Sequence, residues 1–151
     1  SDSHWVIQEF IDGREFNLSV IAGQNGAEVM PPAEIVFTDN WEDKPRIIDF
    51  KAKWEEESFE YANTVREFPG QKLDQSLRIK LIDTALKCWH LFGLRGYARV
   101  DMRIDESNNP YVIEVNANPC ISPEGGFMSA TKMAGLSSTE VIQRIIDDLN
   151  Y

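Results

Sequence analysis

Residues 96–119 read Gly-Tyr-Ala-Arg-Val-Asp-Met-Arg-Ile-Asp-Glu-Ser-Asn-Asn-Pro-Tyr-Val-Ile-Glu-Val-Asn-Ala-Asn-Pro, with two runs of alternating polar and apolar residues around a polar centre. Alternation with a period of two is typical of β-strands. The polar stretch 106–110 between the runs predicts a turn with a longer loop. The stretch therefore predicts a β-hairpin, and the rest of the chain can be placed around it.

Alternation also assigns each side chain of this hairpin to a face. On the first strand, Arg99, Asp101 and Arg103 share one face, because side chains two residues apart point the same way. The residues predicted to share the polar face of the second strand are Val112, Glu114 and Asn116.

A turn centred between residues 107 and 108 would place Asp101 opposite Glu114 and Arg99 opposite Asn116. Two carboxylates directly opposite each other repel, so a cation between them is expected. Two carboxylates and an amide are oxygen ligands that suit Mg²⁺, with Mn²⁺ also possible, and Arg99 could clamp a phosphate. The alternative is an ordinary solvated strand face. The hypothesis of a metal site depends on this register, because a shift of one residue in the strand pairing would place a different residue opposite Asp101.

Length and composition limit the class of protein. The 151 residues, of which 42% are hydrophobic, are predicted to form a single domain over residues 1–151. No apolar run approaches the ~20 residues of a membrane helix, so no membrane partner is expected. The net charge of -10 argues against a nucleic-acid partner. Two cysteines and no basic-then-apolar leader favour a cytoplasmic protein.

Apolar periodicity predicts the remaining elements. Strands are expected at 5–10, at 14–22 and over 27–37, the last one broken by Pro31-Pro32. Residues 46–54 look extended, and the acidic, aperiodic stretch 55–70 is predicted to be a mobile loop. Helices are expected at 73–92, at 127–134, and from a capping box at Ser137 and Glu140 through 149. Strands first and helices around one more hairpin, without a βαβ rhythm, predict an α+β fold with an antiparallel β-sheet and packed helices.

Four motifs in this order resemble a known family. They are Gln-Glu-Phe-Ile-Asp-Gly-Arg-Glu-Phe at 8–16, Lys-Ala-Lys-Trp at 51–54, Gly-Tyr-Ala-Arg-Val-Asp at 96–101 and Glu-Val-Asn-Ala-Asn-Pro at 114–119. Together they resemble the C-terminal lobe of an ATP-grasp carboxylate–amine ligase of the D-alanine–D-alanine ligase-like group. The resemblance implies an enzyme that uses ATP and Mg²⁺ to activate a small-molecule carboxylate as an acyl phosphate, which an amine then attacks.

The resemblance also implies a role for each motif residue. The strand end at 8–11 would be the hinge that reads adenine, Glu15 would bind the ribose hydroxyls, and Lys53 would reach a phosphate. Arg99 would contact the transferred phosphate. Without the motifs, Glu15 and Lys53 would be interpreted as exposed strand residues. The implied nucleotide-binding residues are Gln8, Glu9, Phe10, Ile11, Glu15 and Lys53; the implied catalytic residues are Arg99 and Lys53; the implied metal ligands are Asp101, Glu114 and Asn116.

Three departures from the family pattern concern the base and the acceptor substrate. Gln8 stands where a glutamate is usual, Trp54 replaces a tyrosine, and Cys120 takes the place of a glycine. The nucleotide and metal half of the pattern therefore matches while the acceptor half does not, which predicts a product other than D-alanyl-D-alanine. The Cys120 thiol is interpreted as a bystander.

The chain also holds no glycine-rich phosphate loop, so the resemblance implies that the N-terminal lobe is a missing partner. The isolated chain is therefore expected to be nearly inactive. The competing hypothesis is a non-catalytic nucleotide-binding or interaction module derived from such a lobe.

Overall fold

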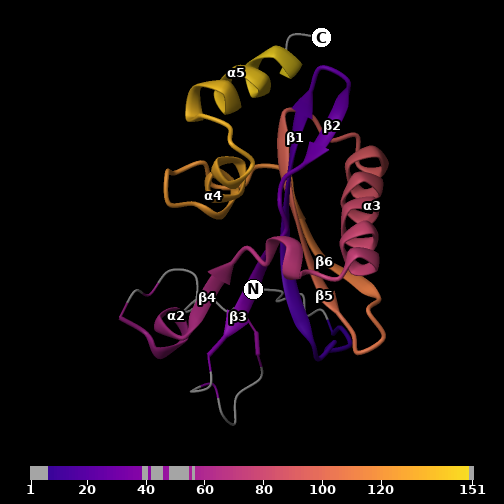
Figure 1. Ribbon diagram of the computed structural model, residues 1–151, viewed down its shortest axis with the longest axis vertical. Helices are drawn as coiled ribbons and strands as arrows, with labels where there is room; N and C mark the ends of the chain where they lie inside the picture. Colours follow the sequence, from indigo (N-terminus) through magenta and orange to yellow (C-terminus); the bar gives the residue numbers. More distant parts are fainter. Residues whose placement is uncertain (1–6, 39–40, 42–45, 48–54, 56, 150–151) are drawn as a thin grey trace, which may run out of the picture.

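A computed structural model describes residues 7–38, 41, 46–47, 55 and 57–149, and shows an antiparallel sheet with helices on both faces (Figure 1). The strand order is β4-β3-β1-β5-β6, and β2 also pairs with β1; the strand pairings among these described residues are all antiparallel. The strands are β1 Arg14–Gly23, β2 Gly26–Val29, β3 Ala33–Phe37, β4 Thr64–Glu67, β5 Tyr97–Ile104 and β6 Pro110–Asn116. The predicted α+β class is confirmed.

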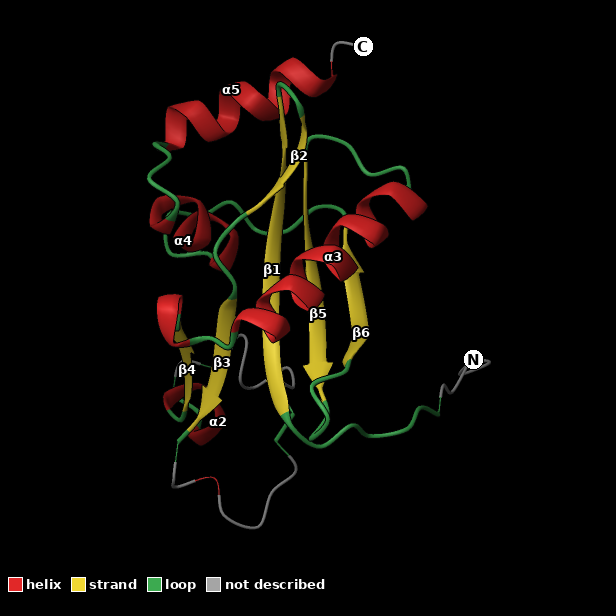
Figure 2. Ribbon diagram, turned by 45° about the vertical axis from the view of Figure 1, so that its right-hand side comes forward, coloured by secondary structure: helices red, strands yellow, loops and turns green. Residues whose placement is uncertain are grey.

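The main core lies between one face of the sheet and helix α3, Gln75–Leu91 (Figures 1 and 2). Every second residue of β1 and β5 points to this face, as strand geometry requires. Burying these apolar side chains against α3 is the main stabilising contribution on this side. The buried residues of this core are Phe16, Leu18, Val20, Ala22, Leu73, Leu77, Leu81, Ala85, Cys88, Trp89, Ala98, Val100, Met102 and Ile104.

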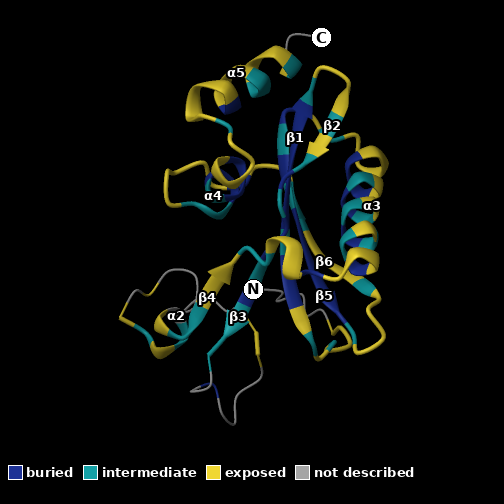
Figure 3. Ribbon diagram, viewed as in Figure 1, coloured by how far each residue is buried: buried dark blue, intermediate teal, exposed yellow. Residues whose placement is uncertain are grey.

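A second, smaller core covers only one end of the opposite face. Helices α4, Gly126–Met133, and α5, Ser138–Leu149, pack there, and Figure 3 shows β1 buried along most of its length between the two helical layers. The buried residues of this core are Ile21, Met30, Phe127, Met128, Ala130 and Val141. The other end of this face carries polar side chains, which form the candidate site described below.

The helix boundaries follow from their capping residues. The carboxylate of Asp74 accepts a hydrogen bond from the Leu77 amide at 2.9 Å, which caps the start of α3. Gly93 has a φ of 57°, the left-handed conformation that favours glycine just past a helix end. The helix predicted at 73–92 is confirmed, although Phe92 is the C-cap residue beyond its last turn and is 60% exposed.

Two predicted elements are wrong. Residues 7–10 form no strand, and Ile7 is 96% exposed, because no described strand pairs with this segment. The stretch 55–70 is not a structureless loop, since it contains α2, Phe59–Ala62, and the edge strand β4. Strand β4 pairs with β3 through backbone hydrogen bonds, which amphipathic periodicity does not reveal. The predicted extended segment 46–54 lies mostly outside the described residues.

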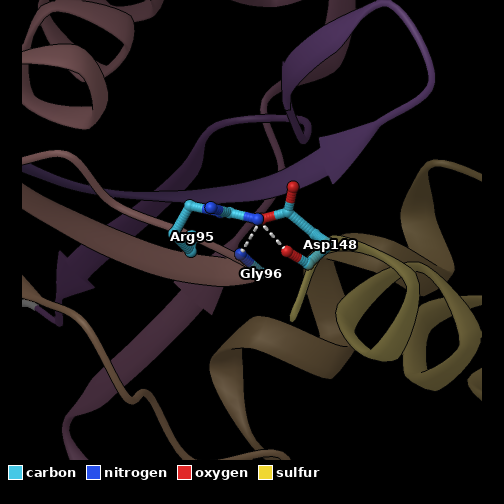
Figure 4. Close-up of polar contacts among 3 residues, drawn as sticks. All are labelled: Arg95, Gly96 and Asp148. Carbon is cyan, nitrogen blue, oxygen red and sulfur yellow. Dashed lines mark hydrogen bonds and ion pairs between the residues drawn. The ribbon is translucent and has the colours of Figure 1, made fainter. Parts of the chain in front are cut away.

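The carboxylate of Asp148, near the end of α5, binds the turn before β5 (Figure 4). Asp148 accepts a hydrogen bond from the Gly96 amide at 2.6 Å and one from Nε of Arg95 at 3.1 Å, while Arg95 also donates to the Asp148 carbonyl. The backbone hydrogen bond from Gly96, followed by the contact with Arg95, lowers the pKa of Asp148. The position of Gly96, at the start of β5, is therefore stabilised by a residue of the C-terminal helix α5.

We expect this contact to make the fold sensitive to acid. A carboxyl group whose pKa is lower in the folded chain stabilises the fold above its unfolded pKa, and this contribution is lost as the pH falls through the folded pKa. Asp148→Asn should lower the free energy of unfolding at pH 7 by about 1–2 kcal/mol, and should reduce the loss of stability below about pH 4. Urea denaturation between pH 3 and 7 measures both. The matched control is Asp147→Asn, and an identical pH profile for the wild type and Asp148→Asn would contradict the assignment.

Candidate functional site

The hairpin of β5 and β6 brings the predicted metal ligands together in the expected register. Asp101 pairs with Glu114, and Arg99 pairs with Asn116. Beyond Asp101 the register shifts at a bulge, so Met102 lies opposite Val112. Val112 therefore belongs to the α3 face, and its predicted place beside Glu114 is wrong.

A polar array covers the part of the sheet that α4 and α5 leave open. Cross-strand partners share a face, so the pairings define three neighbouring rows of side chains. The array contributes from β1, β5 and β6, respectively: Glu15, Arg103 and Tyr111 in the first row; Asn17, Asp101 and Glu114 in the second; Ser19, Arg99 and Asn116 in the third. The hairpin register was predicted from the sequence, and so was Glu15 as a site residue. Asn17 and Ser19 on β1 were missed, although they alternate with Phe16, Leu18 and Val20.

Arg99 and Asp101 form a two-bond ion pair at the centre of this array. Nε and Nη2 of Arg99 donate to the two oxygens of Asp101, each at 2.7 Å. Asp101 is only 6% exposed, so this pairing neutralises a buried carboxylate. Burial lowers the pKa of Arg99, but the hydrogen bonds and charge of Asp101 outweigh it and the pKa is raised. The charges of Glu114 and Glu15 act in the same direction.

The other two predicted metal ligands lie on the edge strand β6. Glu114 is exposed and faces Asp101 across the strands, at a Cα separation of about 5 Å. The side-chain oxygen of Asn116 accepts a hydrogen bond from the Asn118 amide at 2.9 Å, which fixes its orientation and leaves a second lone pair. Tyr97 donates in turn to the side chain of Asn118. The loop after β6 thus holds the amide oxygen of Asn116 in a defined position.

Glu15 and Arg103 form a second, more deeply buried pair at the hairpin end of the array. Nη1 of Arg103 donates to Oε2 of Glu15 at 3.0 Å, and both residues are almost fully buried. Strand β1 begins just after Gly13, where a Cβ would lie 2.0 Å from the Ile104 carbonyl oxygen, so only glycine permits this close approach. The glycine of the motif therefore sets where Glu15 enters the sheet.

The segment predicted to read the base lies next to this pair. Nε of Arg103 donates to the Ile11 carbonyl at 2.9 Å, and the guanidinium lies 5.2 Å from the ring centroid of Phe10. Gln8 and Glu9 are exposed and precede this contact. Lys53, the other predicted catalytic residue, lies outside the described residues.

Cys120 lies in the loop after β6, where the positive charge of Arg99 influences the pKa of its thiol. Hydrogen bonding with Ser122 lowers the pKa of the Cys120 thiol, and the positive charge of Arg99 adds to this effect. The thiol is exposed, and both cysteines of the chain are free. The sequence places Cys120 directly after the metal-ligand motif of β6, but the effect of Arg99 on the thiol was not predicted.

The donor set fits a hard cation shared with a phosphate ligand. Within the described ranges, no three His, Cys, Asp or Glu side chains gather as metal ligands. The predicted set has two carboxylates and one amide, and Mg²⁺ is commonly held by one or two carboxylates together with substrate phosphates and water. A carboxylate offers about four lone-pair positions, so Asp101 can bind Arg99 through two and still bind a metal. Mg²⁺ at this donor set would need further oxygen ligands, from water or from a bound phosphate.

Comparisons with known proteins show which proteins this chain is similar to. A family model described as "D-ala D-ala ligase C-terminus" matches residues 1–147. The chain is 34% identical over 146 residues to the D-alanine–D-alanine ligase of Carboxydothermus hydrogenoformans, covering 96% of this chain and 43% of that protein. It is 32% identical to D-alanine–D-alanine ligase B of Clostridium perfringens, covering 97% of this chain and 43% of that protein. The chain thus spans less than half the length of these curated relatives.

Solved structures show the same fold. The D-alanine–D-alanine ligase of Bacillus anthracis complexed with ATP matches with a TM-score of 0.69 at 22% identity, over 92% of this chain and 38% of that one. The VanG D-Ala:D-Ser ligase of Enterococcus faecalis matches with a TM-score of 0.67 at 19% identity, over 92% and 37%. In the described part of the chain, no helix is both long and apolar enough to cross a membrane.

Proposed function

Because this chain belongs to the D-ala D-ala ligase C-terminus family, we propose that it is the Mg-ATP-binding lobe of an ATP-dependent ligase that joins a carboxylate to an amine. The observation that carries the proposal is the pairing of Asp101 with Glu114, beside Arg99 and Asn116, on the open face of the sheet. Two carboxylates placed opposite each other are stabilised by a cation, and oxygen ligands select a hard one.

In this proposal, Asp101, Glu114 and Asn116 would hold Mg²⁺. The metal would supply charge neutralisation for phosphoryl transfer. Arg99 lies beside the metal ligands, and the two ends of its guanidinium bind planar or tetrahedral anions well. Its raised pKa keeps it positively charged throughout the physiological range. Lys53 is proposed to add a second cation at the phosphates, and Glu15 to bind the ribose at the Arg103 end.

The proposed reaction has two steps. A carboxylate oxygen of the first substrate attacks the γ-phosphorus of ATP, and the bond from that phosphorus to the bridging β-phosphate oxygen breaks. The products of this step are an acyl phosphate and ADP. The amine of the second substrate then attacks the acyl carbon, loses a proton and expels inorganic phosphate as the C–N bond forms. Neither step needs a covalent protein nucleophile, so the site works by positioning and charge stabilisation.

A second lobe with a glycine-rich phosphate loop is proposed to cover the nucleotide, because no described helix or strand packs over the polar array on the side away from the sheet. We place the reaction in the cytoplasm, where ATP is available. The departures at Trp54 and Cys120 favour an acceptor amine other than D-alanine, whereas the departure at Gln8 concerns the base. The carboxylate and amine are therefore proposed as amino-acid-type substrates without a fixed identity.

The test is substrate-dependent release of ADP by the intact protein that carries this chain. We expect ADP and phosphate to appear in equal amounts when Mg-ATP is supplied with a panel of amino acids and small carboxylates, and not with Mg-ATP alone. A coupled assay for ADP measures this. Binding of Mg-ATP without release of ADP for any member of the panel would contradict the ligase and favour a non-catalytic nucleotide-binding module.

A further inference from the structure

Arg103 is a buried arginine that the proposed reaction does not yet use. It is 5% exposed, and its Nε and Nη1 are fully committed to the protein. Nε donates to the Ile11 carbonyl at 2.9 Å, and Nη1 donates to the Arg46 carbonyl at 2.6 Å as well as to Glu15. Nη2 is buried and has no hydrogen-bond partner in the described part of the chain.

An unmade hydrogen bond at a buried charged donor destabilises the folded protein. Nearly all buried polar groups in folded proteins have a partner, so an exception marks a place where a ligand can supply one. Two observations indicate which ligand. Arg103 lies two residues from Asp101 on the same face, about 7 Å along the strand. It also touches Phe10 and Ile11, on the side of the array away from Arg99 and Asn116.

Under the proposed function, the phosphates meet the metal ligands and the ribose lies at Glu15, so the nucleoside would extend toward Arg103. We propose that Nη2 of Arg103 donates a hydrogen bond to an acceptor of the bound nucleoside, either a ribose oxygen or a purine ring nitrogen, and so contributes to the choice of nucleotide. This inference rests on the proposed function, because it takes the nucleotide as the ligand.

The geometry requires an arginine at this position. Nε and Nη1 of the planar guanidinium donate hydrogen bonds to Ile11, Glu15 and Arg46, which leaves Nη2 to donate to the ligand. A lysine has a single nitrogen, so it can maintain the charge beside Glu15 but cannot also reach the nucleoside. Arg103→Lys therefore separates the ligand contact from the need for a buried positive charge.

The experiment compares nucleotides in the intact protein by isothermal titration calorimetry with Mg²⁺. The probes are ATP and analogues that each lack one acceptor: 2′-deoxy-, 3′-deoxy-, 1-deaza-, 3-deaza- and 7-deaza-ATP. In the wild type, we expect at least one analogue to bind about 10-fold or more weakly than ATP, because a hydrogen bond to a charged donor is lost. In Arg103→Lys, the difference between ATP and that analogue should fall to about 2-fold or less. The deoxy arms identify a ribose contact and the deaza arms a base contact.

The matched control is Arg14→Lys, which alters an exposed arginine paired with Glu34 away from the array's centre. It should leave every ratio of affinities unchanged. Arg103→Gln is the second variant, should the lysine variant fail to fold in thermal unfolding. Equal weakening of ATP and all analogues by Arg103→Lys, or analogues that all bind the wild type like ATP, would overturn the contact. Failure of the wild type to bind Mg-ATP at all would instead overturn the proposed function.

Discussion

Asp101→Asn and Glu114→Gln are each expected to lower kcat/KM for ADP release by about 100-fold or more in the intact protein. Each change keeps the size of the side chain and removes one negative ligand from the face where Mg²⁺ is proposed to bind. Losses of this size are typical when a single group that stabilises developing charge is removed. The measurement is the coupled ADP assay at saturating Mg²⁺, followed by a Mg²⁺ titration.

The exposure of Glu114 and a control variant on α3 distinguish a loss of catalysis from a loss of folding. Glu114 lies exposed on the edge strand, so Glu114→Gln should leave the thermal unfolding temperature within about 2 °C of the wild type. The matched control is Asp83→Asn, which removes a carboxylate from an exposed pair with Lys87 on α3, and such pairs contribute little. Turnover by Glu114→Gln at the wild-type rate would contradict the metal assignment.

Phe127→Ala is expected to lower the free energy of unfolding by about 3–5 kcal/mol. Phe127 is completely buried in the smaller core, and its ring lies edge-on to Tyr97 with the centroids 5.2 Å apart. Since the free energy of unfolding of a domain is about 5–15 kcal/mol, this single change removes a large part of it. Urea denaturation followed by circular dichroism measures the loss.

The control for this change lies on the same helix. Met133 is the last residue of α4 and is 56% exposed, so Met133→Ala should alter the free energy of unfolding by less than about 0.5 kcal/mol. Similar losses for both variants would mean that α4 does not pack on the sheet through Phe127. Tyr97 carries the hydroxyl that binds Asn118, so damage to this core should also disturb the loop that orients Asn116.

Local signals in the sequence predicted much of the fold. The start of α3 was predictable because Asp74 is a strong cap, and the capping box of α5 is confirmed by the mutual contacts of Ser137 and Glu140. Strand β1 was predictable because its alternation faces an apolar core. Strand β4 was not, because it lies at the sheet edge and its residues are largely exposed, so no apolar periodicity marks it.

The site was predictable where it depends on the hairpin and not where it depends on distant pairing. Asp101 and Glu114 are brought together by one turn, which the sequence signals locally. The bulge that turns Val112 to the α3 face has no such signal. Arg103 meets Glu15 across 88 residues of sequence, so its role required the pairing of β1 with β5.

The central claim is that the open face of this sheet binds a nucleotide through Mg²⁺, and the affinity for ATP with and without the metal tests it most directly. Calorimetric titration of ATP into the intact wild-type protein should give binding that is at least about 10-fold tighter with Mg²⁺ than with a chelator. In Glu114→Gln most of that difference should disappear. ATP binding that is unaffected by Mg²⁺ in the wild type, or a metal effect of the same size in Glu114→Gln, would contradict the claim.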